Sequence, residues 1–181
     1  LSGPAQIVIF DIHALQERFY FSDQVIPRLE SGVALVRDKL SRIEQPAVAF
    51  PDEGAWKRFG RWFDGYPVIV CHKLRDGQRR RITVREGRPE NRHVVIVDDL
   101  AMSGGTLLEC RRALVANGAR AVSAYVTHAV FPAEAWRPFL NAGFDHFWIT
   151  DSVPRQAERL DGQPPFEVLS LAPSIGALLA D

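Results

Sequence analysis

The chain has 181 residues, with 22 lysines and arginines against 22 aspartates and glutamates, so its formal net charge is +0. A balanced charge creates no long-range field that would attract nucleic acid or an anionic membrane. Apolar residues make up 46% of the chain, which is enough for a real core. No apolar run approaches the length of a membrane span. We therefore expect one domain over residues 1–181, with no nucleic-acid or membrane partner.

The two cysteines, Cys71 and Cys110, are too few for a disulfide framework and do not have the spacing of a Cys/His zinc site. Both fall in segments that we predict to be buried. The first residues lack a signal-peptide pattern, and we expect residues 1–4 to be a non-native remnant. These features favour reduced core thiols in a cytoplasmic protein.

In the first half of the chain, short branched or aromatic runs alternate with segments whose apolar residues recur every three or four positions. This alternation predicts strands at 6–10, 46–50 and 67–71, and helices at 30–43 and 54–63. Residues 74–92 are polar and basic, with a short alternating piece at 81–84. That pattern favours a hairpin or a mobile flap.

The second half continues the alternation. It predicts strands at 94–97, 121–127, 146–150 and 166–169, and helices at 106–117 and 132–142. Gly118 and Gly143 follow the two helices as end signals, Pro132 suits a first turn, and Ser174 can cap a last helix. Strands that alternate with helices predict an α/β fold of three layers, with a mainly parallel central sheet and helices on both faces.

The most informative stretch is residues 93–106, in which the buried strand leads directly into Asp98 and Asp99 and then into a loop of small residues. Open α/β sheets bind ligands at the carboxyl ends of their strands. The loop from Ser103 to Thr106 offers hydroxyls and backbone N–H groups at a helix N-terminus, which suits a phosphate. The acids could equally be a cap and a solvated carboxylate, but the unbroken order favours a phosphosugar site.

This stretch resembles the phosphoribosyl-diphosphate motif of the type I phosphoribosyltransferase fold. Its flanks resemble ribose-phosphate pyrophosphokinases, in particular the plant-type branch. The matching segments are residues 10–16 (FDIHALQ), 50–58 (FPDEGAWKR), 73–75 (KLR) and 124–131 (AYVTHAVF). The resemblance covers nearly the whole chain in the family's order. It also implies that roughly the N-terminal third of the family's length is absent here.

The resemblance implies a role for each matching residue. Lys73 and Arg75 would lie on the catalytic loop and contact the diphosphate during its transfer. Mg²⁺ would be held by His13, Asp52 and Asp11, although Asp52 is equally well explained as a helix cap. Ribose 5-phosphate would be bound by Asp98, Asp99, Ala101, Met102, Ser103, Gly104, Gly105 and Thr106. Met102 stands where many members have an acid, and methionine can neither hold Mg²⁺ nor accept a hydrogen bond strongly.

The implied activity is that of an enzyme of nucleotide biosynthesis, a ribose-phosphate diphosphokinase. It would transfer diphosphate from ATP to ribose 5-phosphate, with Mg²⁺, as a homo-oligomer. Two alternatives stay open. A phosphoribosyltransferase would use the same loop with a base substrate, and the short length favours it. A non-catalytic protein associated with the synthase is favoured by Met102. We predict that His72 and His93 are surface residues and that His128 lies near the ligand edge.

Overall fold

The computed structural model describes residues 5–22, 24–76 and 79–180, so the remnant predicted at residues 1–4 lies outside it. The helices are η1 (Leu15–Tyr20), α1 (Val33–Leu40), α2 (Glu53–Phe59), η2 (Gly60–Phe63), α3 (Gly105–Ala116), η3 (Pro132–Glu134), η4 (Arg137–Asn141), α4 (Pro154–Leu160) and α5 (Ala172–Ala180). The strands are β1 (Ala5–Phe10), β2 (Val25–Glu30), β3 (Pro46–Phe50), β4 (Val68–Asp76), β5 (Arg79–Glu86), β6 (His93–Ala101), β7 (Ala121–Ala129), β8 (Phe147–Thr150) and β9 (Phe166–Leu169). None of the helices in the described ranges has the length and apolar character that crossing a membrane requires.

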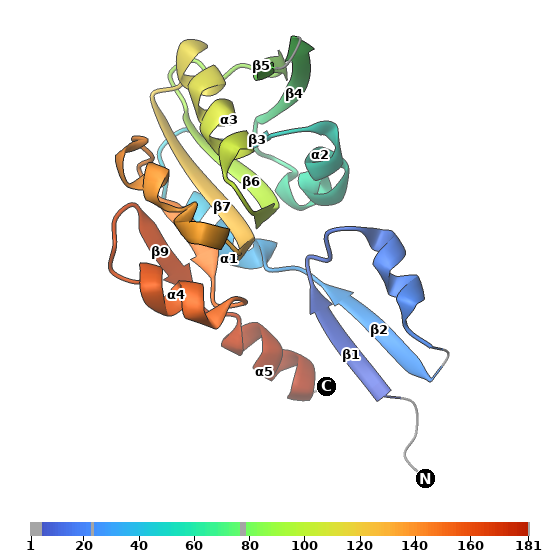
Figure 1. Ribbon diagram of the computed structural model, residues 1–181. Helices are drawn as coiled ribbons and strands as arrows, with labels where there is room; N and C mark the ends of the chain where they lie inside the picture. Colours follow the sequence, from blue (N-terminus) through green and yellow to red (C-terminus); the bar gives the residue numbers. More distant parts are fainter. Residues whose placement is uncertain (1–4, 23, 77–78, 181) are drawn as a thin grey trace.

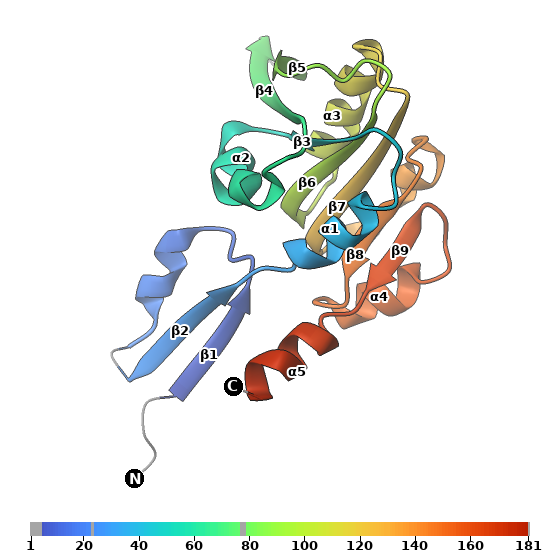
Figure 2. The same cartoon turned by 180° about the vertical axis from the view of Figure 1, so that it is seen from behind.

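The central sheet has seven strands in the order β5-β4-β3-β6-β7-β8-β9 (Figure 1). Every neighbouring pair is parallel except β4 and β5, which form an antiparallel pair within the region where a hairpin was predicted. Helices cover both faces of the sheet, and Figure 2 shows α1 and α2 in front of it and α3 behind it. The predicted three-layer α/β fold is therefore confirmed.

Alternation along β6 builds both halves of the core. Val94 and Ile96 pack on one face with apolar residues of α3, η4 and α4, whereas Val95 and Val97 pack on the other with residues of α1, α2 and η2. All four of these side chains are buried. A strand covered on both faces needs an unbroken apolar run, which explains why this strand could be predicted from the sequence.

The N-terminal strand lies outside the central sheet. The strand at 6–10 exists, but it pairs with β2 in a separate parallel two-stranded sheet that projects from the domain (Figures 1 and 2). The helix expected from residue 30 begins at Val33. The reason is that residues 25–30 form β2, and that Ser31 and Gly32 bind the Asp11 carboxylate before the helix starts.

Two further element predictions need correction. The helix expected at 132–142 is instead the short 3₁₀ helices η3 and η4. Phe131 and Ala133 have φ values of 40° and 50°, and Pro138 lacks the N–H that a continuous helix would use. The last helix begins at Ala172, so Ser174 cannot cap it. Its cap-like bond comes from Ser170, whose Oγ accepts from the Ala172 N–H at 3.2 Å.

Candidate functional site

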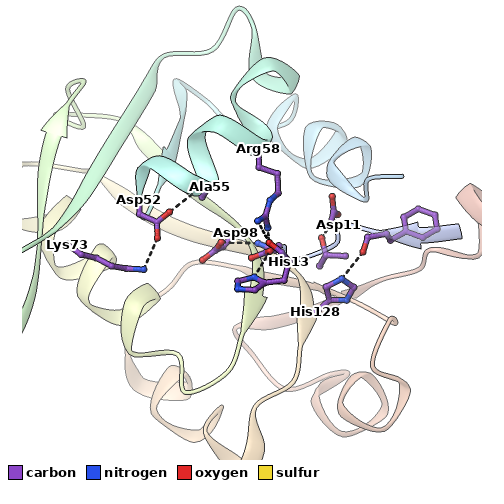
Figure 3. Close-up of polar contacts among 11 residues, drawn as sticks. Asp11, His13, Asp52, Ala55, Arg58, Lys73, Asp98 and His128 are labelled. Atoms are coloured by element: carbon purple, nitrogen blue, oxygen red, sulfur yellow. Dashed lines mark hydrogen bonds and ion pairs between the residues drawn. The ribbon is translucent and has the colours of Figure 1, made fainter. Parts of the chain in front are cut away.

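A cavity of about 400 Å³ opens at the carboxyl ends of β3, β4 and β6. This volume is within the range of small-molecule sites. Nearly all of its lining comes from segments singled out in the sequence: His13, Asp52, Gly54, Ala55, Arg58, Lys73, Asp98, Asp99, Leu100, Ala101, Met102, Ser103, Gly104, Thr106 and Leu107. Polar side chains from three strand ends thus converge on one space (Figure 3).

One wall of the cavity is the loop that starts α3. Gly104 is the residue before the helix and has φ 74°, a conformation that favours glycine. A Cβ on Gly104 would lie 2.4 Å from the Phe139 ring, so the loop packs directly on η4. Among the described residues, no side chain caps α3. The N–H groups of its first turn are therefore available to a phosphate, beside the hydroxyls of Ser103 and Thr106.

Asp98 lies at the floor of the cavity and is partly buried. Burial, followed by the nearby Asp52 carboxylate, raises the pKa of Asp98 to about 7, and the charges of Lys73, Arg58 and His13 only partly offset this. Asp98 Oδ1 accepts one hydrogen bond, from the Asp99 N–H at 3.0 Å. This carboxylate is therefore poorly compensated and would be stabilised by a cation or by hydroxyl donors.

Asp99, the next residue, is compensated. It is only 2% exposed. Its Oδ2 accepts from the Arg58 guanidinium and lies 2.9 Å from His13 Nδ1. Arg58 also donates to the carbonyl oxygen of His13, so α2 and the segment after β1 are tied to the end of β6 (Figure 3). The two predicted ribose-binding acids therefore have different surroundings.

Asp52 and Lys73 form the opposite wall. Asp52 caps α2 by accepting from the Ala55 N–H at 3.0 Å, and its second oxygen accepts from Lys73 Nζ at 2.7 Å (Figure 3). Burial by itself would raise the pKa of Asp52, but these hydrogen bonds and the Lys73 charge lower it below its ordinary value. The predicted cap is confirmed, and Lys73, which is half-exposed, is held at the cavity by an ion pair that a ligand can replace.

Asp11 lies elsewhere. It lines a second cavity of about 340 Å³ rather than the first, and it is 5% exposed. Within the described residues, no three His, Cys, Asp or Glu side chains are gathered closely enough to hold a metal ion, so His13, Asp52 and Asp11 do not converge. Arg75 belongs to β4, but its side chain lies outside the described residues. The catalytic role of Arg75 stays a prediction.

Arg58 is the site residue that the sequence reasoning missed. A usable signal was present, because Asp52, Ala55 and Arg58 follow one another at intervals of three, the spacing of one helix face. Met102 is 47% exposed at the cavity rim, whereas Ala101 is buried beneath the loop. The site thus combines a helix start without a side-chain cap, a poorly compensated carboxylate and a lysine, an arrangement that can bind an anion and stabilise negative charge.

No protein-family model matches the chain. Among curated proteins, the chain is 53% identical over 186 residues to ribose-phosphate pyrophosphokinase 4 of Arabidopsis thaliana, covering 98% of this chain and 55% of that protein. It is 51% identical to the mitochondrial ribose-phosphate pyrophosphokinase 3 of Spinacia oleracea, covering 98% of this chain and 46% of the relative. The chain thus spans about half the length of the curated relatives it matches.

Among solved structures, the phosphoribosylpyrophosphate synthetase of Mycobacterium smegmatis matches with a TM-score of 0.80 at 23% identity. The match covers 97% of this chain and 57% of that one. At this identity the likeness concerns the fold, and it extends over the projecting β1/β2 unit as well as the central sheet.

Proposed function

We propose that the chain belongs to the ribose-phosphate pyrophosphokinase family, whose members it matches at 51–53% identity over about half of their length, and that it carries the ribose 5-phosphate site and the transfer lysine of such an enzyme. The reaction would move a diphosphate from ATP to ribose 5-phosphate and yield phosphoribosyl diphosphate and AMP. One observation supports this assignment above the others. The uncapped start of α3, Asp98 and Lys73 all face one cavity.

In the proposed complex, the 5-phosphate lies against the first turn of α3 and the hydroxyls of Ser103 and Thr106. A helix N-terminus attracts anions through its free N–H groups and its dipole. Asp98 would accept hydrogen bonds from the ribose hydroxyls, because its carboxylate is the poorly compensated one. Asp99 would hold Arg58 and His13 in place beside the sugar.

The 1-hydroxyl oxygen would then attack the β-phosphorus of ATP. The bond from that phosphorus to the oxygen shared with the α-phosphate breaks, AMP leaves with that oxygen, and the hydroxyl proton passes to solvent. Charge on the moving group must be stabilised in place. Lys73 would exchange its ion pair with Asp52 for the phosphoryl oxygens. No covalent enzyme intermediate is required.

The residues present fit a Mg²⁺ ion. Mg²⁺ is usually held by one or two carboxylates together with substrate phosphates and waters. Asp52 and Asp98 face the same cavity, and the Asp52 charge raises the cost of ionising Asp98, so a divalent cation held there would relieve that repulsion. When bound, the ion would neutralise charge on the diphosphate oxygens. Asp11 is excluded from this proposed set because it lines the other cavity.

The decisive experiment measures AMP release from ATP by the purified chain with Mg²⁺ and ribose 5-phosphate. A parallel assay offers phosphoribosyl diphosphate and a panel of free bases. Product in the first assay only supports the proposal, and product in the second only supports a phosphoribosyltransferase. Since the chain spans about half of its relatives, ribose 5-phosphate affinity should also be measured by calorimetry. Binding without turnover in either assay would favour a non-catalytic protein or a partial enzyme.

Oligomerisation and compartment complete the proposal. We propose a homo-oligomer in the cytoplasm. Relatives with the names mitochondrial and chloroplastic make the organelles the competing compartments. Light scattering of the purified protein and fractionation of tagged protein in its own cells would test the two statements separately.

A further inference from the structure

β1, η1 and β2 form a unit that lies outside the central sheet. β1 and β2 pair with each other and project from the domain (Figures 1 and 2). The joint lies where β1 ends and where the chain returns after β2. There the Phe10 carbonyl accepts from His128 Nε2 at 2.8 Å, and the Asp11 N–H donates to the Glu30 carbonyl at 2.9 Å.

The Asp11 carboxylate is the centre of this joint. Its Oδ1 accepts from Ser31 Oγ at 2.5 Å, and its Oδ2 accepts from the Gly32 N–H at 2.9 Å and from Thr127 Oγ1 at 2.6 Å. These donors are uncharged protein groups, and all three lie on the domain side of the joint. Asp11 also has φ 44°, which is strained for a non-glycine residue and persists only where surrounding contacts enforce it.

The domain side of the joint is built to receive this carboxylate. Thr127 Oγ1 is in turn 3.1 Å from the buried Tyr125 hydroxyl. A Cβ on Gly32 would lie 2.5 Å from that hydroxyl, so only glycine lets the backbone approach closely enough to donate to Asp11. Burial, followed by the Asp11 charge, raises the pKa of Tyr125, so its hydroxyl stays protonated as a donor.

The joint leads directly to the candidate site. Asp11 and His13 are two residues apart, a reach of at most about 7 Å. His13 Nδ1 is 2.9 Å from Asp99 Oδ2, and the His13 carbonyl accepts from Arg58. A change in the position of Asp11 would therefore move His13 relative to Asp99.

We propose that Asp11 is a positioning residue, not a Mg²⁺ ligand: its three hydrogen bonds to Ser31, Gly32 and Thr127 lock the 5–30 unit to β7 and thereby hold His13 against Asp99 at the cavity. This inference rests on the proposed function only in giving His13 a place beside the substrate. A Mg²⁺ ion on Asp11 would compete with these donors and would lie at the second cavity, away from Asp52 and Asp98.

The test compares Thr127→Val, which removes one donor to Asp11, with Thr127→Ser, which keeps the hydroxyl. Thr127 does not line the cavity. We expect Thr127→Val to shift the NMR signals of the His13 ring and to speed amide exchange over residues 11–14 by about ten-fold, the equivalent of one lost hydrogen bond. Thr127→Ser should restore both readouts. Neither readout needs turnover, so the result is independent of the proposed activity.

A second measurement separates positioning from metal binding. Asp11→Asn keeps the shape and most of the acceptor capacity, so we expect it to leave the affinity for Mn²⁺, used as a paramagnetic probe, within about two-fold of the parent protein. Loss of a true carboxylate ligand should weaken metal binding at least about ten-fold. Weakened Mn²⁺ binding in Asp11→Asn with unchanged exchange in Thr127→Val would overturn the proposal. If the parent binds no Mn²⁺, the exchange and NMR comparison decides alone.

Discussion

The two ends of the central sheet carry similar side chains and do different things. At the amino end of β6 and β7, His93 Nε2 lies 2.8 Å from Ser123 Oγ, and His93 Nδ1 lies 3.9 Å from Asp145. That order of acid, imidazole and hydroxyl is the arrangement of a hydrolytic triad. At the carboxyl end, Asp98, Asp52 and Lys73 surround a cavity instead.

The two ends of the sheet differ in whether a substrate can reach their polar side chains. The Ser123 side chain is fully buried and its Oγ also accepts from the His146 N–H at 3.2 Å, so its hydroxyl is already used within the fold. No substrate could reach it without unfolding the strand ends. At the carboxyl end, three features surround the cavity: the poorly compensated carboxylate of Asp98, a lysine, Lys73, whose ion pair a ligand can replace, and the start of α3, which has no side-chain cap. Residue types alone therefore do not identify a site. A poorly compensated charge that lines an open cavity is the more informative feature.

The largest expected effect is on turnover at the carboxyl end. In the proposed mechanism the charge that Lys73 meets develops during transfer, so we expect Lys73→Ala to lower kcat about 10²–10³-fold while changing ribose 5-phosphate affinity by less than about three-fold. The matched control is Lys57→Ala, which removes a lysine that pairs with Glu53 on the exposed side of α2. Equal losses of kcat and affinity in Lys73→Ala would make Lys73 a binding residue only.

The next effect compares two adjacent glycines in the phosphate loop. Gly104→Ala should lower the free energy of unfolding by roughly 2–4 kcal/mol, because its Cβ would collide with Phe139 and its φ is positive. Gly105→Ala has only an ordinary contact, at 3.9 Å, and should stay within about 1 kcal/mol of the parent. Urea unfolding of both variants measures this difference. Equal destabilisation would mean that the Gly104 geometry does not hold the loop.

The sequence allowed the central layers to be predicted because their strands and helices are local patterns. Four branched residues in a row predicted a strand buried on both faces, and β6 is such a strand. The interruption of the helix expected at 132–142 was harder to predict, because the left-handed turn at Phe131 is imposed by packing against Phe139 and Phe147. Pro138 alone should have warned against a continuous helix.

Side-chain contacts between residues far apart in the chain could not be predicted from the sequence. Nothing in the letters shows that Asp11 meets Thr127, or that Arg58 meets Asp99 across 41 positions. His93 was predicted to be a surface residue and is buried at 8% exposure, because Ser123 on the neighbouring strand offers it a hydrogen-bond partner. Such contacts cannot be predicted from a local sequence pattern, because the two partners come from different strands or helices.

The third prediction sets the two adjacent acids against each other. Asp98→Asn should raise the stability of the ligand-free protein by roughly 1–2 kcal/mol at neutral pH, because it removes an uncompensated charge near Asp52. Asp99→Asn should lower it by roughly 1–3 kcal/mol, since Arg58 then loses its carboxylate. Thermal unfolding of both variants gives the signs. The same sign for both variants would mean that the charges of Asp98 and Asp99 are offset by their surroundings to the same extent.

Calorimetry on the same pair completes this comparison. Asp98→Asn should weaken ribose 5-phosphate binding about ten-fold or more despite its greater stability, a trade-off expected where a site is held in an unfavourable state for its ligand. Asp99→Asn should weaken binding less, because it acts through His13 and Arg58.

The smallest expected effect is on the pH dependence of the unfolding free energy, and it comes from His93 at the amino end of β6. Burial, partly opposed by the Asp145 charge, lowers the pKa of His93 below its ordinary value of 6.5. The unfolded chain therefore takes up a proton on His93 before the folded protein does, so this contribution to stability is complete above pH 6.5 and is lost as the pH falls toward the folded-state pKa. His93→Gln, which keeps a polar group near Ser123, should flatten the fall in unfolding free energy below pH 6.5. His72→Gln, at an exposed position on β4, is the control. An identical slope in parent and His93→Gln would show that His93 does not contribute to the pH dependence of stability.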